Sequence, residues 1–307
     1  MATTEPPPDT HDFVLPFQVG ESAVRGRIVR LGASVDEILM RHDFPHPVSA
    51  LLGEATALVA MMGAALKFDG KLIFQAQGNG PAPMIVADYT AGGALRATAT
   101  VSGDVEETAG TAVIGAGHIV MTVDQGADME RYQGVTPLDG GRLEDAAVSY
   151  FMQSEQIPTA IRLAVGRLSA PGEPDRWRAG GIMVQFVPGE GGTRERGAEV
   201  LMSDDDQESW ENAAAFVQTI EDDELLDPSI AAETVLYRLF HERGVRIFER
   251  QPMRAECSCN ADKIHAVLAR YNETELADMV EDGAILVTCE FCRRDYQFNA
   301  NGEPLSA

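Results

Sequence analysis

All four cysteines of this 307-residue chain lie within its last 51 positions, in two close pairs. One residue separates Cys257 from Cys259, two separate Cys289 from Cys292, and 29 residues lie between the pairs. A disulfide scaffold would spread its cysteines along a short secreted chain, whereas clustered pairs indicate metal or redox chemistry. We therefore expect the C-terminal region to fold so that the two pairs meet.

Zinc is the metal that this residue set favours. Four thiolates complete the tetrahedral shell that structural Zn²⁺ prefers and leave no open position for catalysis on a bound water. Residues i and i+2 of an extended segment project to the same side, so Cys257 and Cys259 can reach one ion. The second pair, Cys289 and Cys292, follows a strand-like run at 284–288, and residues 295–298 are expected to return as its hairpin partner. We expect one Zn²⁺ per chain, bound by all four cysteines in the reduced state.

The segment between the pairs has few apolar residues for an independent fold. Asn260 is expected to cap a helix that carries Ile264, Val267 and Leu268, and the pattern repeats with Leu276, Met279 and Val280. Structural zinc contributes roughly 10 to 16 kcal/mol to small metal-dependent folds, so its loss should unfold this region. His265 lies on the first predicted helix and is expected to be a surface or packing residue rather than a fifth ligand.

Zinc-bound thiolates are also the form of cysteine that peroxide or hypochlorite oxidises. Sequence neighbours are the natural disulfide partners, Cys257 with Cys259 and Cys289 with Cys292, and their oxidation would remove the ligands of the metal. A purely structural zinc site is the alternative interpretation. A nucleic-acid-binding ribbon is disfavoured because acidic residues offset the basic ones, and a thioredoxin-like site because no helix is predicted after the second pair.

Charge narrows the possible partners. The chain has 24 Lys and Arg residues against 48 Asp and Glu residues, a formal net charge of −24. Such a field repels phosphate backbones and anionic lipid, so neither nucleic acid nor a membrane is an expected partner. The stretch 48–66 is apolar but contains Glu54, and we expect a buried core helix there. Residues 1–12 lack the features of a secretory signal, which predicts a cytoplasmic location.

Alternating strand-like and helical runs over residues 13–187 predict an α+β domain, with helices packed on a sheet. Two Val-, Ile- and Phe-rich strands, 71–77 and 84–89, flank a Gly-Asn-Gly-Pro turn. Residues 49–68 and 142–153 have helical composition.

The middle of the chain is acidic and helical. A Gly-rich boundary is expected at 188–203, before a helix with Trp210, Ala214, Val217 and Ile220 on one face. A second helix is predicted to begin at Asp227-Pro228 and to end at Gly244, with an apolar face of Ala232, Leu236, Leu239 and Phe240. The like-charged run 221–224 lies between them. Either an ordinary docked hairpin or a detachable one, whose apolar faces bind a partner when released, fits this pattern.

The cysteine spacing resembles that of the heat-shock protein 33 family of redox-regulated holdase chaperones. Other segments typical of that family are 44–45, 51–54, 66–70, 77–81, 95–96, 154–158 and 237–242, and Tyr296 and Phe298 follow the second cysteine pair as in the family. The resemblance covers nearly the whole chain. The polar extension 1–12 and the Gly-rich stretch near 189–197 depart from the family pattern without touching a motif.

That resemblance implies three regions: an α+β core at 1–188, an acidic helical linker that senses folding at 189–244, and a zinc-binding redox domain at 245–307. It implies that the reduced, zinc-bound form is inactive. Oxidation to two disulfides would release zinc, unfold the linker and give a homodimer that holds unfolding client proteins. No phosphate-binding loop is present, so ATP is not expected. A zinc-stabilised scaffold protein is the alternative, and an enzyme comes third because no spacing supports catalytic residues.

Overall fold

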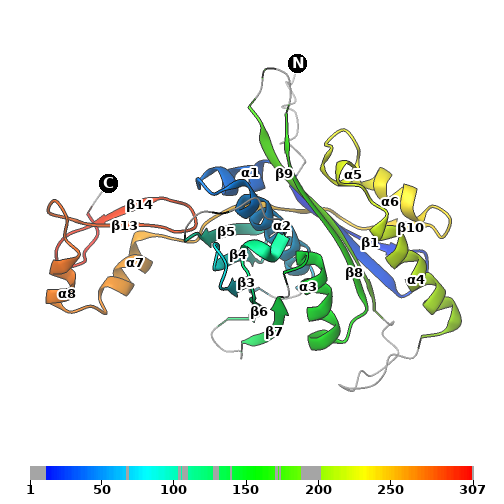
Figure 1. The fold of residues 1–307 in the computed structure, drawn as a ribbon, viewed down its shortest axis with the longest axis horizontal. Helices are drawn as coiled ribbons and strands as arrows, with labels where there is room; N and C mark the ends of the chain where they lie inside the picture. Colours follow the sequence, from blue (N-terminus) through cyan, green and yellow to red (C-terminus); the bar gives the residue numbers. More distant parts are fainter. Residues whose placement is uncertain are drawn as a thin grey trace, which may run out of the picture. The chain divides into compact units, whose positions relative to one another are not determined.

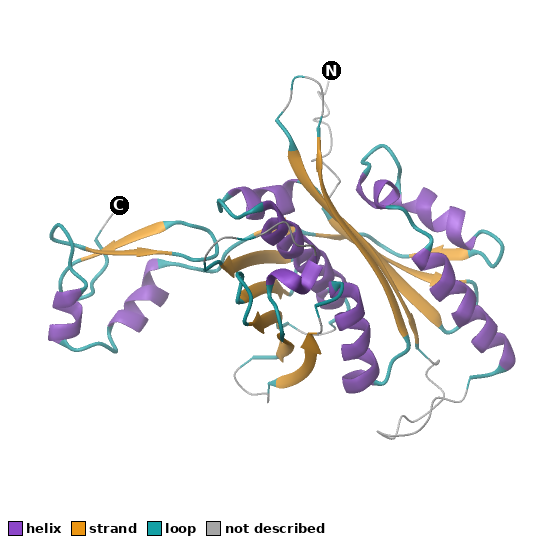
Figure 2. Ribbon diagram, in the orientation of Figure 1, coloured by secondary structure: helices purple, strands orange, loops and turns teal. Residues whose placement is uncertain are grey.

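A computed structural model describes residues 12–66, 69–102, 105, 110–126, 131–138, 140–169, 172, 174–187 and 202–305. The chain forms two compact units, 1–255 and 256–307, which are described separately. The fold is mixed α+β, as predicted (Figure 2). The division into core, linker and zinc domain stays a prediction, although residues 245–255 add short strands to the sheets of the first unit.

The first sheet joins distant parts of the sequence in the order β10-β1-β2-β9-β8, with β11 also paired to β1. Every pair in it is antiparallel. Its strands are β1 (Phe13–Val19), β2 (Val24–Leu31), β8 (Thr159–Leu168), β9 (Arg176–Phe186), β10 (Val245–Ile247) and β11 (Gln251–Pro252). The alternation of side chains along β2 gives the sheet two apolar faces, because Ile28 belongs to one buried cluster and Val29 to the other.

The second sheet has the order β12-β5-β4-β3-β6-β7. Its strands are β3 (Lys71–Gly78), β4 (Met84–Thr90), β5 (Ala94–Thr100), β6 (Gly117–Asp124), β7 (Tyr132–Leu138) and β12 (Arg254–Ala255), and a 3₁₀ turn, η1 (Gly110–Val113), precedes β6. The predicted hairpin around the Gly-Asn-Gly-Pro turn is confirmed as β3 and β4. Both sheets belong to the first unit of the chain, and the helices that contact both of them lie between them.

Helix α2 (His46–Gly63) contacts strands of both sheets and confirms the predicted core helix. Nearly all of its residues are buried, which explains its continuous apolar sequence. Two shorter helices, α1 (Ala33–Met40) and α3 (Leu143–Tyr150), flank it, and α3 continues as a π-helical turn, η2 (Phe151–Glu155). In the part of the chain that the structure describes, no helix is long and apolar enough to cross a membrane.

Three helices cover the other face of the first sheet, as Figure 1 shows. They are α4 (Asp204–Gln218), α5 (Asp222–Leu226) and α6 (Ala232–Phe240). We call residues 202–244 the acidic segment. Most of the predicted apolar stripes are buried in it, with Val217, Ile220, Leu236 and Phe240 all at most 3% exposed, while Trp210, Ala214 and Leu239 are partly buried.

One predicted helix boundary is wrong. The helix expected from Asp227-Pro228 to Gly244 begins only at Ala232 and ends at Phe240. Asp227 instead closes α5 and starts a turn, in which its carboxylate accepts a hydrogen bond from the Ser229 amide at 2.7 Å. The like-charged run 221–224 forms the start of α5, where Glu221 and Glu224 make a reciprocal capping box. The predicted boundary at 188–203 lies outside the described residues except for 202 and 203.

The C-terminal unit contains two helices and a hairpin: α7 (Ala261–Leu268), α8 (Glu273–Asp278), β13 (Ile285–Thr288) and β14 (Asp295–Phe298). The hairpin is the predicted one, and the Asn260 side chain caps α7 by accepting from the Lys263 amide at 2.8 Å, also as predicted. Its buried apolar cluster has four members: Leu268, Leu276, Ile285 and Phe298. This unit therefore has a small core.

Candidate metal centre

The four cysteines come from two segments of the C-terminal unit. Cys257 and Cys259 lie in the extended stretch before α7, as the alternation of side chains predicted. Cys289 and Cys292 lie in the turn of the β13–β14 hairpin. The Cys289 carbonyl accepts from the Arg293 amide at 2.8 Å, and Arg293 adopts a left-handed conformation with φ of 57°. That tight turn brings the second pair of sulfurs to one side of the hairpin.

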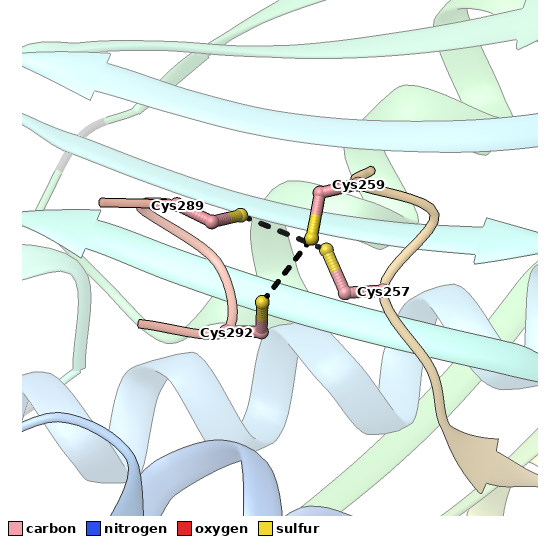
Figure 3. Close-up of side chains that lie close together, drawn as sticks. All are labelled: Cys257, Cys259, Cys289 and Cys292. Carbon is pink, nitrogen blue, oxygen red and sulfur yellow. Dashed lines mark hydrogen bonds between the residues drawn. The ribbon is translucent and has the colours of Figure 1, made fainter. Parts of the chain in front are cut away.

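The four sulfur atoms all lie within 4.8 Å of one another. Figure 3 shows the side chains converging, with 3.7 Å between the sulfurs of Cys257 and Cys289 and 3.3 Å between those of Cys259 and Cys292. A tetrahedral site with Zn–S bonds of about 2.3 Å places its sulfurs about 3.8 Å apart. The cluster thus has the dimensions of a four-thiolate metal site, and the residues present fit a zinc ion.

The acid–base properties of the cluster point the same way. Burial acts to raise the pKa of Cys259, but hydrogen bonds to its sulfur from Tyr296 and the other cysteines outweigh burial and lower the pKa to about 7. Burial and, to a smaller extent, its cysteine neighbours raise the pKa of Cys292 to about 12. Without a cation the cluster therefore favours one thiolate and opposes a second. A divalent ion is what would keep all four sulfurs ionised together.

Tyr296 is a contact that the sequence analysis missed. Its hydroxyl lies 3.1 Å from the Cys259 sulfur, where it can donate a hydrogen bond to a thiolate. The alternation of β14 could have suggested it, because Tyr296 and Phe298 share one face of the strand. His265 does not join the cluster; its Nδ1 lies 2.6 Å from the Gly302 carbonyl oxygen, which agrees with a packing role.

The acidic segment is held by one buried and one partly buried arginine that the sequence analysis also missed. Arg30 of β2 is only 6% exposed and donates to the carbonyl oxygens of Glu224 at 2.7 Å and Asp227 at 2.6 Å. Arg162 of β8 pairs with Asp222 of α5 at 2.5 Å. Because these carbonyls lie at the C-terminal end of α5, the guanidinium of Arg30 satisfies groups that the helix itself leaves unpaired.

A glycine on the sheet lets α5 come close. A Cβ on Gly180 of β9 would lie 2.6 Å from the Leu225 carbonyl oxygen, so only glycine fits the present packing. Leu225 itself is fully buried against the sheet. Docking of the acidic segment thus depends on direct backbone contact in addition to its apolar side chains.

Comparisons with known proteins agree with the fold. The model of the Hsp33 protein family matches residues 12–299. The 33 kDa chaperonin of Caulobacter vibrioides strain NA1000 / CB15N is 45% identical, and the alignment covers 97% of this chain and 99% of that protein. The 33 kDa chaperonin of Escherichia coli O7:K1 is 32% identical, with coverage of 94% and 93%.

A solved structure has the same fold. The crystal structure of the 33 kDa chaperonin of Thermotoga maritima, a heat shock protein 33 homolog, superposes with a TM-score of 0.77. Its sequence is 24% identical, and the match covers 95% of this chain and 96% of that one. The family match spans both compact units, including all four cysteines. This chain therefore belongs to the Hsp33 family.

Proposed function

We propose that this chain is a redox-regulated, ATP-independent holdase chaperone that acts in the cytoplasm on unfolding proteins. The observation that carries the proposal is the convergence of four cysteine sulfurs within 4.8 Å of one another, in a chain whose relatives are named 33 kDa chaperonins. A full set of four thiolates suits a structural metal and a redox switch equally well. It leaves no ligand position for catalysis on a bound water, so we do not propose an enzyme.

In the reduced state, Cys257, Cys259, Cys289 and Cys292 hold one Zn²⁺. The ion supplies positive charge that keeps the sulfurs ionised and ties the segment before α7 to the hairpin turn. Tyr296 orients and stabilises the Cys259 sulfur by donating to it. The four-residue core of the C-terminal unit is small, so the metal provides most of the stability of that unit. In this state the chaperone is inactive.

Oxidation by peroxide converts the four cysteines to two disulfides. Each disulfide forms as two thiolates give two electrons to one peroxide, which takes up two protons and leaves as two waters. We propose the pairs Cys257–Cys259 and Cys289–Cys292. The shortest sulfur separations in the reduced arrangement instead join Cys257 to Cys289 and Cys259 to Cys292.

The choice of disulfide pairs decides whether the segment before α7 stays linked to the hairpin. Disulfides between the two segments would replace the metal as a cross-link and preserve the unit. Disulfides within each pair would remove every sulfur link between the segment before α7 and the hairpin. Only the pairing within each segment therefore couples oxidation to loss of the C-terminal fold.

Activation then requires release of the acidic segment. Its helices cover an apolar face of the first sheet that includes Leu15, Phe17 and Ile28, all at most 1% exposed. Undocking would uncover this face together with the apolar sides of α4 and α6, and such surface binds unfolding proteins without a fixed pocket. Two copies with this face uncovered would associate, which supports a homodimer as the active form. The net charge of −24 disfavours nucleic acid and membranes as partners.

The test follows metal, thiols and activity together. Reduced protein is treated with peroxide at a mildly raised temperature, while a chromogenic chelator records zinc release, a thiol count records oxidation and a heat-denatured client records suppression of aggregation. We expect about one zinc to leave per chain as four thiols disappear and suppression begins. Zinc release without suppression would leave a zinc-stabilised scaffold protein as the better description.

Peptide mapping of the oxidised protein decides the pairing. Cleavage between the two segments should yield each pair of cysteines in a separate disulfide-linked peptide. Peptides that link Cys257 to Cys289 would contradict the proposed switch. The double variant Cys289→Ser/Cys292→Ser should bind zinc weakly and suppress aggregation even when reduced, whereas Ser258→Ala, within the first pair, should behave like the unmodified protein.

A further inference from the structure

The first unit contains a cavity of about 340 Å³ between its two sheets. Its walls come from β2 and β9 of the first sheet, from β3, β6 and β7 of the second, and from the end of α2 and the π-helical turn. Most of the wall is apolar, with Met62, Leu72, Phe151 and Met183 among its side chains. This volume is at the small end of ligand sites in proteins. The cavity is separate from the cysteine cluster, which belongs to the other unit.

One cationic side chain lines this apolar cavity. Arg27 lies on the face of β2 opposite to Ile28 and Arg30, so it projects toward the helices between the sheets. Among the described residues no hydrogen bond or ion pair to its guanidinium is found. Burial and, to a smaller extent, the charge of Arg25 lower the pKa of Arg27 to about 10. Arg27 therefore stays protonated at neutral pH, and among the described residues no carboxylate pairs with its guanidinium, although Glu155 lies in another part of the wall.

Arginines on the opposite face of the first sheet have partners, so the lack of one for Arg27 among the described residues is unusual in this molecule. Arg30 and Arg162 both hold the acidic segment: Arg30 donates to two backbone carbonyls, and Arg162 pairs with the Asp222 carboxylate. Buried charges in proteins are normally paired in this way, because desolvation of an ion without a partner is unfavourable. Arg27 is the exception among these three, and it faces a cavity large enough to admit a partner.

Two further polar groups around the cavity have partners within the protein. The Tyr150 hydroxyl lies 3.3 Å from Glu155 Oε1, and the Gln185 side-chain amide donates to Thr159 Oγ1 at 3.2 Å. The π-helical turn is what brings Tyr150, Phe151 and Glu155 to one wall, and such turns are frequent at functional sites. The guanidinium of Arg27 is thus the cationic group that this wall offers to a ligand.

We propose that this cavity binds a small amphiphilic carboxylate, with the carboxylate on Arg27 and an aliphatic or aromatic body against the apolar wall. A planar guanidinium matches a carboxylate with two parallel hydrogen bonds. The apolar lining selects a hydrophobic body over a sugar or a nucleotide. Such a ligand would neutralise a charge that the free protein leaves uncompensated, and would stabilise the first unit independently of the redox state of the cysteines.

Decanoate and 1-decanol provide a direct test, because they share a body and differ in charge. Reduced, zinc-supplemented full-length protein is titrated with each by calorimetry and by thermal unfolding, below the concentration at which decanoate forms micelles. We expect decanoate to raise the Tm of the first unit by about 5 °C at a hundredfold excess over its Kd. We expect 1-decanol to bind at least about tenfold more weakly.

Arg27→Gln and Arg25→Gln form a matched pair, because both remove one charge from β2 but only Arg27 lines the cavity. Arg27→Gln should weaken decanoate binding at least about tenfold and raise the Tm of the free protein, whereas Arg25→Gln should leave binding unchanged. Any of three results would overturn the proposal. The first is equal binding of decanoate and 1-decanol, and the second is equal effects of the two variants. The third is no binding of decanoate at about 1 mM, a concentration at which weak, fragment-sized ligands bind. If Arg27→Gln fails to fold, the comparison of the two ligands on the unmodified protein decides.

Discussion

The acidic segment and the C-terminal unit are both helical additions to a sheet-rich chain, but they are stabilised in different ways. The acidic segment buries eight apolar residues against the first sheet: Ala213, Val217, Ile220, Leu225, Ala232, Val235, Leu236 and Phe240. The C-terminal unit buries four within itself. What the second region lacks in apolar core it replaces with four cysteines in one cluster. The first region depends on packing and the second on the chemistry of sulfur.

This difference assigns a different trigger to each region. Thiol chemistry can abolish the stability of the C-terminal unit at constant temperature, because its cross-link is made of oxidisable groups. The acidic segment has no cysteine and responds only to conditions that weaken burial, hydrogen bonds or charge pairing. A switch that needs both oxidant and heat follows naturally from two regions with separate sensitivities.

The largest effect should come from removing the metal under reducing conditions. A chelator should take away roughly 10 to 16 kcal/mol from the C-terminal unit, far more than its small core supplies. Hydrogen exchange should then show loss of protection throughout α7, α8 and the β13–β14 hairpin. Amides of β3 and β4 in the first unit serve as the internal control and should keep their protection. A C-terminal unit that stays protected after complete metal removal would show that its apolar core suffices.

The second prediction concerns the packing of the acidic segment. Gly180→Ala places a Cβ 2.6 Å from the Leu225 carbonyl oxygen, a backbone atom that cannot move without shifting α5. We expect the free energy that holds the segment in place to fall by about 1 to 3 kcal/mol, which faster exchange in α5 and α6 would report. The thermal threshold for suppression of client aggregation should fall in parallel.

Gly166→Ala is the matched control for that substitution. Its added Cβ would meet only the end of the Leu226 side chain, at 3.2 Å, and a flexible side chain can give way. The effect on exchange in α5 should therefore be clearly smaller. If the two variants behave alike, close backbone approach is not what holds α5, and the contrast with the C-terminal unit weakens.

Local features of both regions could be predicted from sequence. Asn260 capped the helix that follows it, and strand alternation located the hairpin that carries the second cysteine pair. The start of α6 could not be predicted, because Asp227-Pro228 has the pattern of a helix start but forms a turn whose carbonyl is held by Arg30. That contact spans 197 positions, and no local pattern contains it.

For the cysteine cluster, too, some features could be predicted from the sequence and others could not. Spacing alone predicted which residues would meet, because four thiolates in two close pairs satisfy one metal. It could not predict which sulfurs lie closest or that Tyr296 contacts Cys259, because both depend on how the hairpin faces the segment before α7. Side-chain chemistry was visible in the sequence, whereas three-dimensional order was not.

A third prediction tests whether charge contributes to docking beside packing. The pKa of Glu54 in α2 is raised to about 7, mainly by burial. The charges of Glu144 in α3 and Asp222 in α5 raise it as well, and those of Arg142 and Arg162 oppose the shift. Because the folded pKa lies above the ordinary value of 4.5, the folded state binds the proton more tightly. The resulting stability is fully present below about pH 4.5 and is lost as the pH rises through about 7.

Between pH 6 and pH 8 the first unit should therefore lose about 1 to 2 kcal/mol. Glu54→Gln should flatten this slope and stabilise the unit at pH 8, as thermal unfolding at the two pH values would reveal. Glu37→Gln, an exposed substitution on neighbouring α1, is the control and should retain the slope. A slope that survives in Glu54→Gln would assign the pH dependence to another group.

The smallest effect should come from the helix caps of the C-terminal unit. It measures how small a part of the stability of that unit comes from its helices. The Asn272 side chain accepts from the amides of Thr274 and Glu275, both at 3.0 Å, while the Glu275 carboxylate accepts from the Asn272 amide at 2.9 Å. Asn272→Ala should lower the stability of the metal-bound unit by about 0.5 to 1 kcal/mol, as exchange in α8 would show. Asn260→Ala, which removes a cap that accepts one hydrogen bond, from the Lys263 amide, should have less effect on exchange in α7. Neither variant should release zinc, because a loss of this size is small against the roughly 10 kcal/mol or more that the metal contributes. Zinc release from Asn272→Ala would mean that the helices and the cysteines stabilise the unit to similar degrees, and the contrast between its two sources of stability would disappear.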